Sequence, residues 1–128
     1  MNELTMDESL SHVWFLDDTA FEDTGRAGFR RRVIDGDHMQ VWFWRIAGGS
    51  SGSVLHHHLE NEQFGIIVRG RLDFSIGLEG ATERAELGPG DIYLARRGVW
   101  HGDSIFHGDD EVDECWIVDV FAPPRTDT

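Results

Sequence analysis

The sequence predicts an all-β protein, a β-sandwich or small barrel. Apolar residues almost never recur at helical spacing. Instead, short runs rich in β-branched and aromatic residues alternate with polar ones. Turn-forming segments such as "GGSSG" at 48–52 and "GPG" at 88–90 separate these runs, as in sandwiches and barrels. The expected strands cover residues 29–34, 39–47, 53–58, 62–69, 71–78, 82–87, 91–95, 99–106 and 114–121.

The chain length of 128 residues fits one domain, so we expect residues 1–128 to form a single unit. Residues 38–122 carry most of the predicted strands and are expected to build the barrel. Residues 1–28 are acidic and weakly patterned, which favours an N-terminal arm with one strand at 12–16. Such an arm can pack on the sheet or on a neighbouring subunit. We therefore expect a homodimer that pairs edge strands or exchanges the arm.

Composition restricts location and partners. No apolar run is long enough to span a bilayer, and "MNELTMDESLSH" lacks the basic start and apolar stretch of a secretion signal. The single cysteine, Cys115, fits a cytoplasmic protein and is expected to be a buried small hydrophobe. The net charge of −13 argues against nucleic acid and anionic membranes, so the expected partner is a small-molecule substrate. Lysine is absent, so any substrate anion must be held by arginine.

Three consecutive histidines follow the glycine-rich turn. Because side chains alternate along a strand, His56 and His58 are expected on one face and His57 on the other. Two imidazoles two residues apart on one face can bind the same metal ion. On the next strand, Gln63 and Gly65 share a face, and the missing side chain of Gly65 is expected to leave open space for a cavity.

The segment "HHHLENEQFGIIVRG" resembles the first sequence motif of the cupin superfamily. That motif runs G, five residues, H-x-H, three or four residues, E, six residues, G. Here Gln63 stands at the glutamate position and Gly70 at the final glycine. The glycine expected six positions before His56 is missing.

The segment "GDIYLARRGVWH" resembles the second cupin motif, which runs G, five residues, P-x-G, two residues, H. The matching positions are Gly90, Gly98 and His101. Arg96 stands where proline is usual, and Ile105 stands where the motif ends in asparagine. The resemblance implies a double-stranded β-helix, also called a jelly-roll barrel.

The resemblance also implies a metal site made of His56, His58, Gln63 and His101. Glu62 is a competing oxygen ligand, but alternation puts it on the opposite face from Gln63. The expected cofactor is one divalent transition-metal ion, and Zn, Ni, Fe, Mn and Cu stay open. A neutral glutamine leaves the ion more positive than a glutamate does, which favours Lewis-acid over redox chemistry.

The four other histidines are expected to have structural roles; they are His12, His38, His57 and His107. Among them, His107 lies in the acidic segment "HGDDEVDE" and is expected to be solvated. Tyr93 is the only tyrosine, and a metal-bound tyrosine occurs in the cupin lyases that cleave dimethylsulfoniopropionate. Trp42 and Trp44 share a strand face and are expected in the core or at a subunit interface.

The last strand carries a carboxylate between apolar neighbours. Asp119 shares a face with Cys115, Ile117 and Phe121, a costly position unless the carboxylate has partners or a function. It is a candidate general acid or base, the alternative being an exposed strand residue or a loop cap. Arg125 is a candidate clamp for a carboxylate, the alternative being a mobile tail residue.

The ending "DVFAPPR" resembles the "DVFSP-x-R" ending of small cupins that open 4,5-unsaturated uronates, in which the Asp and Arg positions are functional. That resemblance implies roles for Asp119 and Arg125. In the site that we expect, Arg125 together with Arg69 or Arg96 holds an anionic group. We therefore expect a metal-dependent enzyme that acts on a small carboxylate or sugar acid by Lewis-acid and acid–base chemistry, such as ring opening or tautomerisation. An iron-dependent oxygenase and a non-catalytic small-molecule-binding cupin stay open as alternatives.

Overall fold

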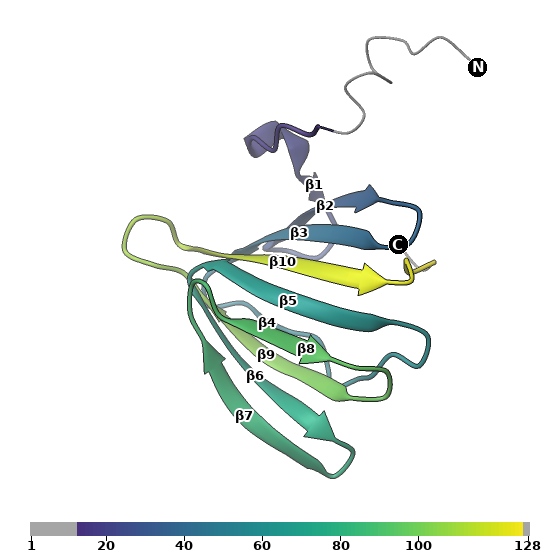
Figure 1. Cartoon of the computed structure of the whole chain (residues 1–128). Coiled ribbons are helices and arrows are strands. Elements are labelled where there is room, and N and C mark those ends of the chain that lie inside the picture. The colour runs from purple at the N-terminus through teal and green to yellow at the C-terminus, as the bar shows by residue number, and fades with distance from the viewer. Residues whose placement is uncertain (1–12, 127–128) are drawn as a thin grey trace, which may run out of the picture.

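The computed structural model describes residues 13–126, which form two antiparallel β-sheets (Figure 1). The predicted all-β jelly roll is confirmed. In chain order the elements are the 3-10 helix η1 (Asp18–Ala20) and the strands β1 (Glu22–Asp23), β2 (Phe29–Asp35), β3 (Gln40–Ala47), β4 (Ser51–Gly52), β5 (Glu62–Arg69), β6 (Arg71–Leu78), β7 (Ala81–Leu87), β8 (Ile92–Ala95), β9 (Trp100–His107) and β10 (Glu114–Ala122).

The larger sheet has six strands in the order β1-β2-β3-β10-β5-β8, and the smaller has four in the order β4-β9-β6-β7. The last strand, β10, therefore lies between β3 and β5 in the middle of the larger sheet (Figure 1). The smaller sheet places β9 next to β6. The segment that resembles the second motif thus contributes to both sheets, through β8 and β9, while the segment that resembles the first contributes β5 to the larger sheet.

The inner faces of both sheets form the core. Burial alternates along β10 as expected, with Cys115, Ile117, Asp119 and Phe121 inside. Cys115 is fully buried, and this burial raises the pKa of its thiol to about 12, so its expected role as a small hydrophobe fits the structure. The core cluster consists of Phe29, Ile46, Ile67, Leu72, Phe74, Phe106, Cys115 and Ile117.

Of the strands expected between residues 29 and 121, all except 53–58 are present, with bounds that agree within one residue. The prediction at 53–58 is wrong, because Ser53 adopts a left-handed φ of 32° and ends β4 after Gly52. Only a single bridge forms in that segment, at His56. Nevertheless, that one bridge orients the histidines.

The expected strand at 12–16 is also wrong where the structure describes it, since residues 13–16 form no strand. Val13 and Phe15 are exposed there. The arm instead contributes η1 and the short strand β1, which pairs with β2. His12 and the rest of residues 1–12 lie outside the described residues. Within residues 13–126 there is no helix with the length and apolar character that crossing a membrane requires.

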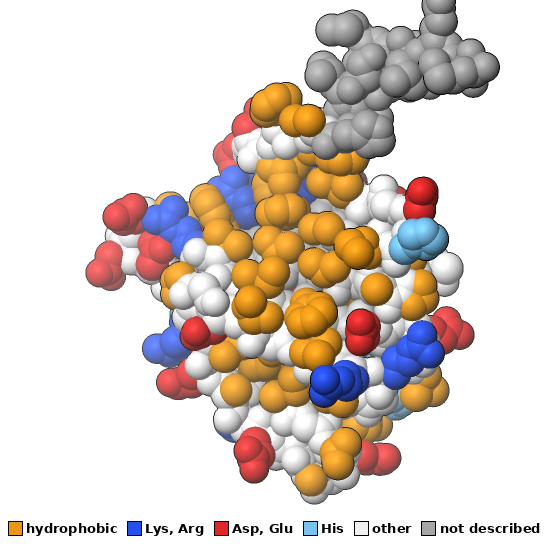
Figure 2. All heavy atoms as spheres, in the orientation of Figure 1, with side chains coloured by type: hydrophobic (Ala, Val, Ile, Leu, Met, Phe, Trp, Pro, Cys, Tyr) orange, Lys and Arg blue, Asp and Glu red, His pale blue; other side chains and the backbone are white. Residues whose placement is uncertain are grey.

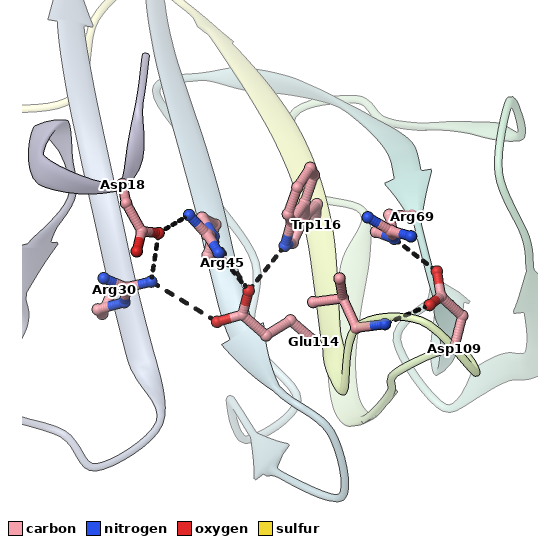
Figure 3. A network of polar contacts seen from close by, with 8 residues as sticks. Asp18, Arg30, Arg45, Arg69, Asp109, Glu114 and Trp116 are labelled. Atoms are coloured by element: carbon pink, nitrogen blue, oxygen red, sulfur yellow. Dashed lines mark hydrogen bonds and ion pairs between the residues drawn. The ribbon is translucent and has the colours of Figure 1, made fainter.

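An ionic network ties the arm to the larger sheet (Figure 3). Asp18 of η1 forms an ion pair with Arg45 of β3 and lies 3.5 Å from Arg30 of β2. Both arginines also contact Glu114 of β10, Arg45 through a hydrogen bond of 2.7 Å. Trp116 donates a further hydrogen bond of 3.0 Å to the Glu114 carboxylate. Strands β2, β3 and β10 therefore meet at the Glu114 carboxylate, and η1 is joined to them through the two arginines.

Glu114 should stabilise the fold in a pH-dependent way. Burial alone would raise its pKa, but the hydrogen bonds from Arg45 and Trp116 and the adjacent positive charges lower the pKa below its ordinary value. The stabilisation is therefore present above the pKa of the unfolded chain and is lost as pH falls through the lower folded-state value.

We predict that Glu114→Gln lowers the free energy of unfolding by about 0.5–1.5 kcal/mol at pH 7, because a partly buried charge-assisted pair is lost. Urea unfolding at pH 7 and at pH 3.5 measures the free energy of unfolding of both proteins. The difference between the wild type and the variant should be smaller at pH 3.5. Glu83→Gln, on an exposed site of β7, is the control and should change little. An equal deficit at both pH values would contradict the prediction.

Candidate metal centre

His56 and His101 are brought together by a reciprocal pair of backbone hydrogen bonds. The amide of His56 donates to the carbonyl of His101 at 2.9 Å, and the reverse bond is 2.8 Å. Residues paired in this way point to the same face, and the two ring centroids lie 4.4 Å apart. Gly102 permits the close approach, because a Cβ there would lie 2.5 Å from the carbonyl oxygen of Val54.

His58 completes a group of three imidazoles. Its carbonyl accepts from the amide of Gly98 at 2.9 Å, which anchors the segment to the loop before β9. The ligand atoms of His56, His58 and His101 all lie within 4.8 Å of one another. Three nitrogen ligands at about 2.1 Å from one ion are separated by roughly 3 to 4 Å, so small ring rotations suffice to bind one. These three histidines could hold a metal ion.

His57 points away from this group, as predicted, and stacks on Trp100 with centroids 4.2 Å apart. His38 lies at an exposed turn. The expectation that His107 is solvated is wrong: its Nε2 lies 2.9 Å from Asp73 Oδ2, and its side chain is half-buried. Its position at the end of β9, rather than in the acidic loop, explains the difference.

Two of the three imidazoles have their tautomer set by backbone carbonyls. The Nδ1 atom of His56 lies 2.7 Å from the carbonyl oxygen of Val54, and that of His101 lies 3.2 Å from the carbonyl oxygen of Val99. A protonated Nδ1 leaves the Nε2 lone pair for a metal. Burial lowers the pKa of His101 to about 4, and repulsion from His56 acts in the same direction. The ring is therefore neutral at pH 7, which is the metal-binding form.

A hydrogen bond to Tyr93 fixes the orientation of the Gln63 side-chain amide. Its Nε2 donates to the hydroxyl of Tyr93 at 2.7 Å, and this hydroxyl donates in turn to Asp119 Oδ1 at 3.4 Å. Burial, followed by the charge of Asp119, raises the pKa of Tyr93 well above its ordinary value, so the hydroxyl keeps its proton. Because the –NH₂ side of the amide faces Tyr93, the oxygen must face the histidines.

The oxygen of Gln63 indeed lies 3.1 Å from His101 Nε2. With His101 protonated on Nδ1, two lone-pair atoms face each other across this distance, an arrangement that a shared cation stabilises. Gln63 is buried while Glu62 is exposed, so alternation has turned Gln63 inward as expected. The donor set therefore fits a divalent transition-metal ion.

Gly65 serves a different purpose from the one expected. A Cβ at this position would lie 1.9 Å from the ring of Tyr93, so the aromatic ring occupies the space that we expected to be open. Gly65 also pairs with Tyr93 on β8 and with Asp119 on β10. Its missing side chain thus allows Tyr93 to reach both Gln63 and Asp119.

Asp119 is buried on the inner face of β10, with 9% of its surface exposed. Its Oδ2 accepts from Trp44 Nε1 at 3.1 Å, and its Oδ1 accepts from the Tyr93 hydroxyl. Burial raises the pKa of Asp119 to about 6, against the hydrogen bonds that it accepts and the nearby charge of Arg125. The structure excludes the alternative of an exposed strand residue.

Arg125 is held at the rim of the same cavity. Its guanidinium stacks on Trp42 and Phe121, with 4.7 and 5.0 Å between the Cζ atom and the ring centroids. The backbone amide of Arg125 donates to the buried Gln40 at 3.2 Å, and the amide of Asn61 donates to the carbonyl of Pro123. The alternative of a mobile tail residue does not fit these contacts.

One cavity of about 210 Å³ is bordered by the three clustered histidines and by Gln63, Tyr93, Asp119 and Arg125. Its other walls are mainly aromatic and aliphatic, and they include Trp42 and Trp44, which the sequence suggested only as core or interface residues. Arg69 and Arg96 do not border the cavity. Arg69 forms ion pairs with Asp109 and Glu111, as Figure 3 shows for Asp109, and Arg96 is exposed.

Two arginines near the cavity were not predicted. Arg26 borders it and donates to the carbonyl of Ser51 at 2.8 Å. Arg31 stacks on Trp42, with its Cζ atom 4.6 Å from the ring centroid. The signal for Arg31 was alternation in "FRRRVI", which puts it on the same inward face as Phe29.

The comparisons with known proteins agree with this geometry. The family described as "Cupin domain" matches residues 42–118. The chain belongs to the cupin family. The resemblance to the cupin superfamily that the sequence motifs indicated is therefore confirmed. No curated protein sequence matches the chain.

Solved cupin-like structures match most of this cupin. KdgF from Halomonas sp. is 27% identical over 84% of this chain and 88% of its own, with a TM-score of 0.66. BH2720 from Bacillus halodurans is 25% identical over 87% and 82%, with a TM-score of 0.64. An RmlC-like cupin from Shewanella frigidimarina is 23% identical over 91% and 94%, with a TM-score of 0.68, which supports the fold alone.

We predict that His101→Ala abolishes stoichiometric binding of a divalent transition metal, because it removes the buried imidazole at the centre of the group. The measurement is metal content per chain by elemental analysis after loading with Zn²⁺ and desalting. His57→Ala is the matched control, since His57 belongs to the same triplet but faces Trp100, and it should keep the metal. Equal metal content in both variants would contradict the assignment.

Proposed function

We propose that this cupin is a metal-dependent enzyme that opens or tautomerises a small sugar acid, with an unsaturated uronate as the specific substrate. The observation that carries the proposal is the buried carboxylate of Asp119, which borders the same cavity as the three histidines. The resemblance of "DVFAPPR" to the ending of uronate ring-opening cupins supports the choice of reaction.

The residues that would hold the metal are His56, His58, His101 and Gln63. The chemistry that a bound divalent cation supplies at such a site is polarisation of a substrate hydroxyl or carbonyl oxygen. The hydrogen bond to Tyr93 keeps the Gln63 oxygen turned toward the histidines. The Nδ1 contacts of His56 and His101 hold their rings in place in the same way.

Ring opening of such a sugar is an isomerisation that needs no oxidant or reductant. The hydroxyl proton of the cyclic hemiacetal leaves, its carbon becomes an aldehyde as the ring C–O bond breaks, and the released enolate takes up a proton on carbon to become a ketone. One group that accepts and returns a proton is sufficient. Asp119 fits this role because its carboxylate borders the cavity and is held by Trp44 and Tyr93.

The cavity also suits the size and charge of the proposed substrate. Its volume of about 210 Å³ is below the roughly 300 to 1,000 Å³ of pockets for drug-sized ligands, and it suits one sugar ring. Arg125 at the rim would pair with the carboxylate in a bidentate manner. The aromatic walls would contact the faces of the ring. Local guanidinium groups are needed because the chain as a whole carries a net charge of −13.

We predict that Asp119→Asn lowers kcat for 4,5-unsaturated galacturonate by roughly 10²- to 10⁴-fold, because proton transfer is lost while the shape is kept. The assay uses metal-loaded protein and monitors, by absorbance, the loss of the ring double bond of the substrate. Asp103→Asn, an exposed site on β9, is the control and should keep full activity. Intact activity in Asp119→Asn would contradict its role. If the wild type does not turn over the sugar but the sugar raises its melting temperature, a binding protein is favoured. If the wild type consumes oxygen with the sugar, an oxygenase is favoured.

We predict that Arg125→Gln raises KM for the same substrate by about 10- to 100-fold, a loss typical of one charged contact, with a smaller effect on kcat. Steady-state kinetics on the metal-loaded variant measure both constants. Arg69→Gln is the matched control, because Arg69 pairs with acidic residues away from the cavity. An equal KM in Arg125→Gln and the wild type would show that the carboxylate is bound elsewhere, with Arg31 as the next candidate.

A further inference from the structure

The side chain of Gln40 is buried at the start of β3, in contact with two residues that border the cavity, Trp42 and Arg125. Only 1% of Gln40 is exposed, so its amide must find its hydrogen-bond partners inside the protein. Register places Gln40 between Asp35 of β2 and Phe121 of β10. Figure 1 shows the C-terminus beside the turn that joins β2 and β3, so the end of the chain passes close to this amide.

Four hydrogen bonds occupy both ends of the Gln40 amide. Its oxygen accepts from the indole nitrogen of Trp42 at 2.6 Å and from the backbone amide of Arg125 at 3.2 Å. Its nitrogen donates to the Asp35 carboxylate at 2.7 Å and to the backbone carbonyl of Arg125 at 3.4 Å. An indole can only donate and an ionised carboxylate can only accept, so the two ends of the amide cannot be exchanged.

The two contacts with the Arg125 backbone hold this residue as a neighbouring strand would, through both its N–H and its C=O. A second buried amide acts on the same segment, because Asn61 donates to the carbonyl of Pro123. The chain has left β10 at Ala122 and has no strand partner there. Side-chain amides therefore replace the sheet in fixing the path of the chain to Arg125.

Gln40 also holds the ring on which the Arg125 side chain lies. The guanidinium carbon of Arg125 is 4.7 Å from the centroid of Trp42, and the nitrogen of this indole donates to Gln40. One amide thus fixes the backbone of Arg125 and, through Trp42, the surface against which the guanidinium stacks. The position of the charged group depends on both contacts.

An arginine that is not held in place would have many competing partners on this protein. The chain has 24 acidic residues and 11 arginines, and Figure 2 shows acidic side chains spread around the margin of the visible face. Ordering a long side chain only when the substrate arrives also costs conformational entropy and weakens binding. A guanidinium that is already fixed at the cavity avoids both losses.

We infer that Gln40 is a positioning residue that holds the guanidinium of Arg125 at the cavity, where it binds the carboxylate of the substrate. The inference rests on the proposed function, in which Arg125 has this role. Gln40 is not among the described residues that border the cavity, so it acts through Arg125 and Trp42 and does not touch the substrate. A purely structural glutamine would affect the stability of the fold alone.

The first test is limited digestion of the full chain with trypsin, which cleaves after arginine, with mass spectrometry of the bond after Arg125. Gln40→Met keeps the length of the side chain and removes all four hydrogen bonds. We expect it to be cut at this bond at least about 10-fold faster than the wild type, because the rate follows the population of the opened segment. Ile67→Val is the matched control: it weakens the core outside the cavity and should be cut as slowly as the wild type.

The second test is steady-state kinetics of the metal-loaded variants with 4,5-unsaturated galacturonate. Gln40→Met should raise KM by about 5- to 10-fold with a smaller effect on kcat, and Ile67→Val should keep both constants. The double variant Gln40→Met, Arg125→Gln should have the KM of Arg125→Gln alone, because the first change acts through Arg125. Additive effects on KM would contradict the inference, and so would an unchanged KM or unchanged cleavage in folded Gln40→Met.

The two readouts separate the inference from the proposed function. If the wild type does not turn over the sugar, the proposed function fails, and the rate of cleavage alone decides whether Gln40 holds Arg125. If Gln40→Met does not fold, Gln40→Glu takes its place, since its carboxylate repels Asp35 and the carbonyl of Arg125 and should speed cleavage. Adding Asp35→Asn restores a donor between the two positions and should slow cleavage again. Equal rates in these two variants would overturn the inference.

Discussion

The hydrogen bond between the Gln63 amide and the Tyr93 hydroxyl determines how the site can work. Tyr93 donates its own proton to the buried Asp119, so it can only accept from Gln63. Gln63 must then present its oxygen to the imidazoles. One chain of hydrogen bonds thus joins the carboxylate proposed for proton transfer to the residues proposed for metal binding. A neutral amide completes the histidine cluster only because its orientation is fixed in this way.

The fold supports this chain through strand register. Tyr93, Gly65 and Asp119 are direct neighbours across β8, β5 and β10. Without a side chain on Gly65, the Tyr93 ring passes over β5 and reaches Gln63 on that strand and Asp119 on β10. The histidines come from the opposite sheet, where the bridge between His56 and His101 replaces a full strand. The cavity between the sheets therefore has Asp119, Tyr93 and Gln63 on one wall and the three histidines on the other.

Alternation and motif spacing predicted much of this arrangement from the sequence. The inward positions of Gln63 and Asp119, and the separation of His57 from its neighbours, follow from local patterns on regular strands. The strand at 53–58 failed because the left-handed Ser53 and the close approach at Gly102 depend on tertiary contacts. The choice of Arg69 and Arg96 failed for a related reason, since sequence position alone does not reveal whether an arginine faces a cavity or an acidic partner. Tyr93 lacked a local signal, because its role depends on a glycine that lies on a different strand.

A crystal structure of the protein loaded with a divalent transition metal, located by anomalous scattering, tests the central claim most directly. The account predicts one ion bound by three imidazole nitrogens and by the oxygen of Gln63, with the amide nitrogen of Gln63 still bonded to Tyr93. An ion bound by Glu62, or a Gln63 amide turned away so that only water completes the site, would contradict it.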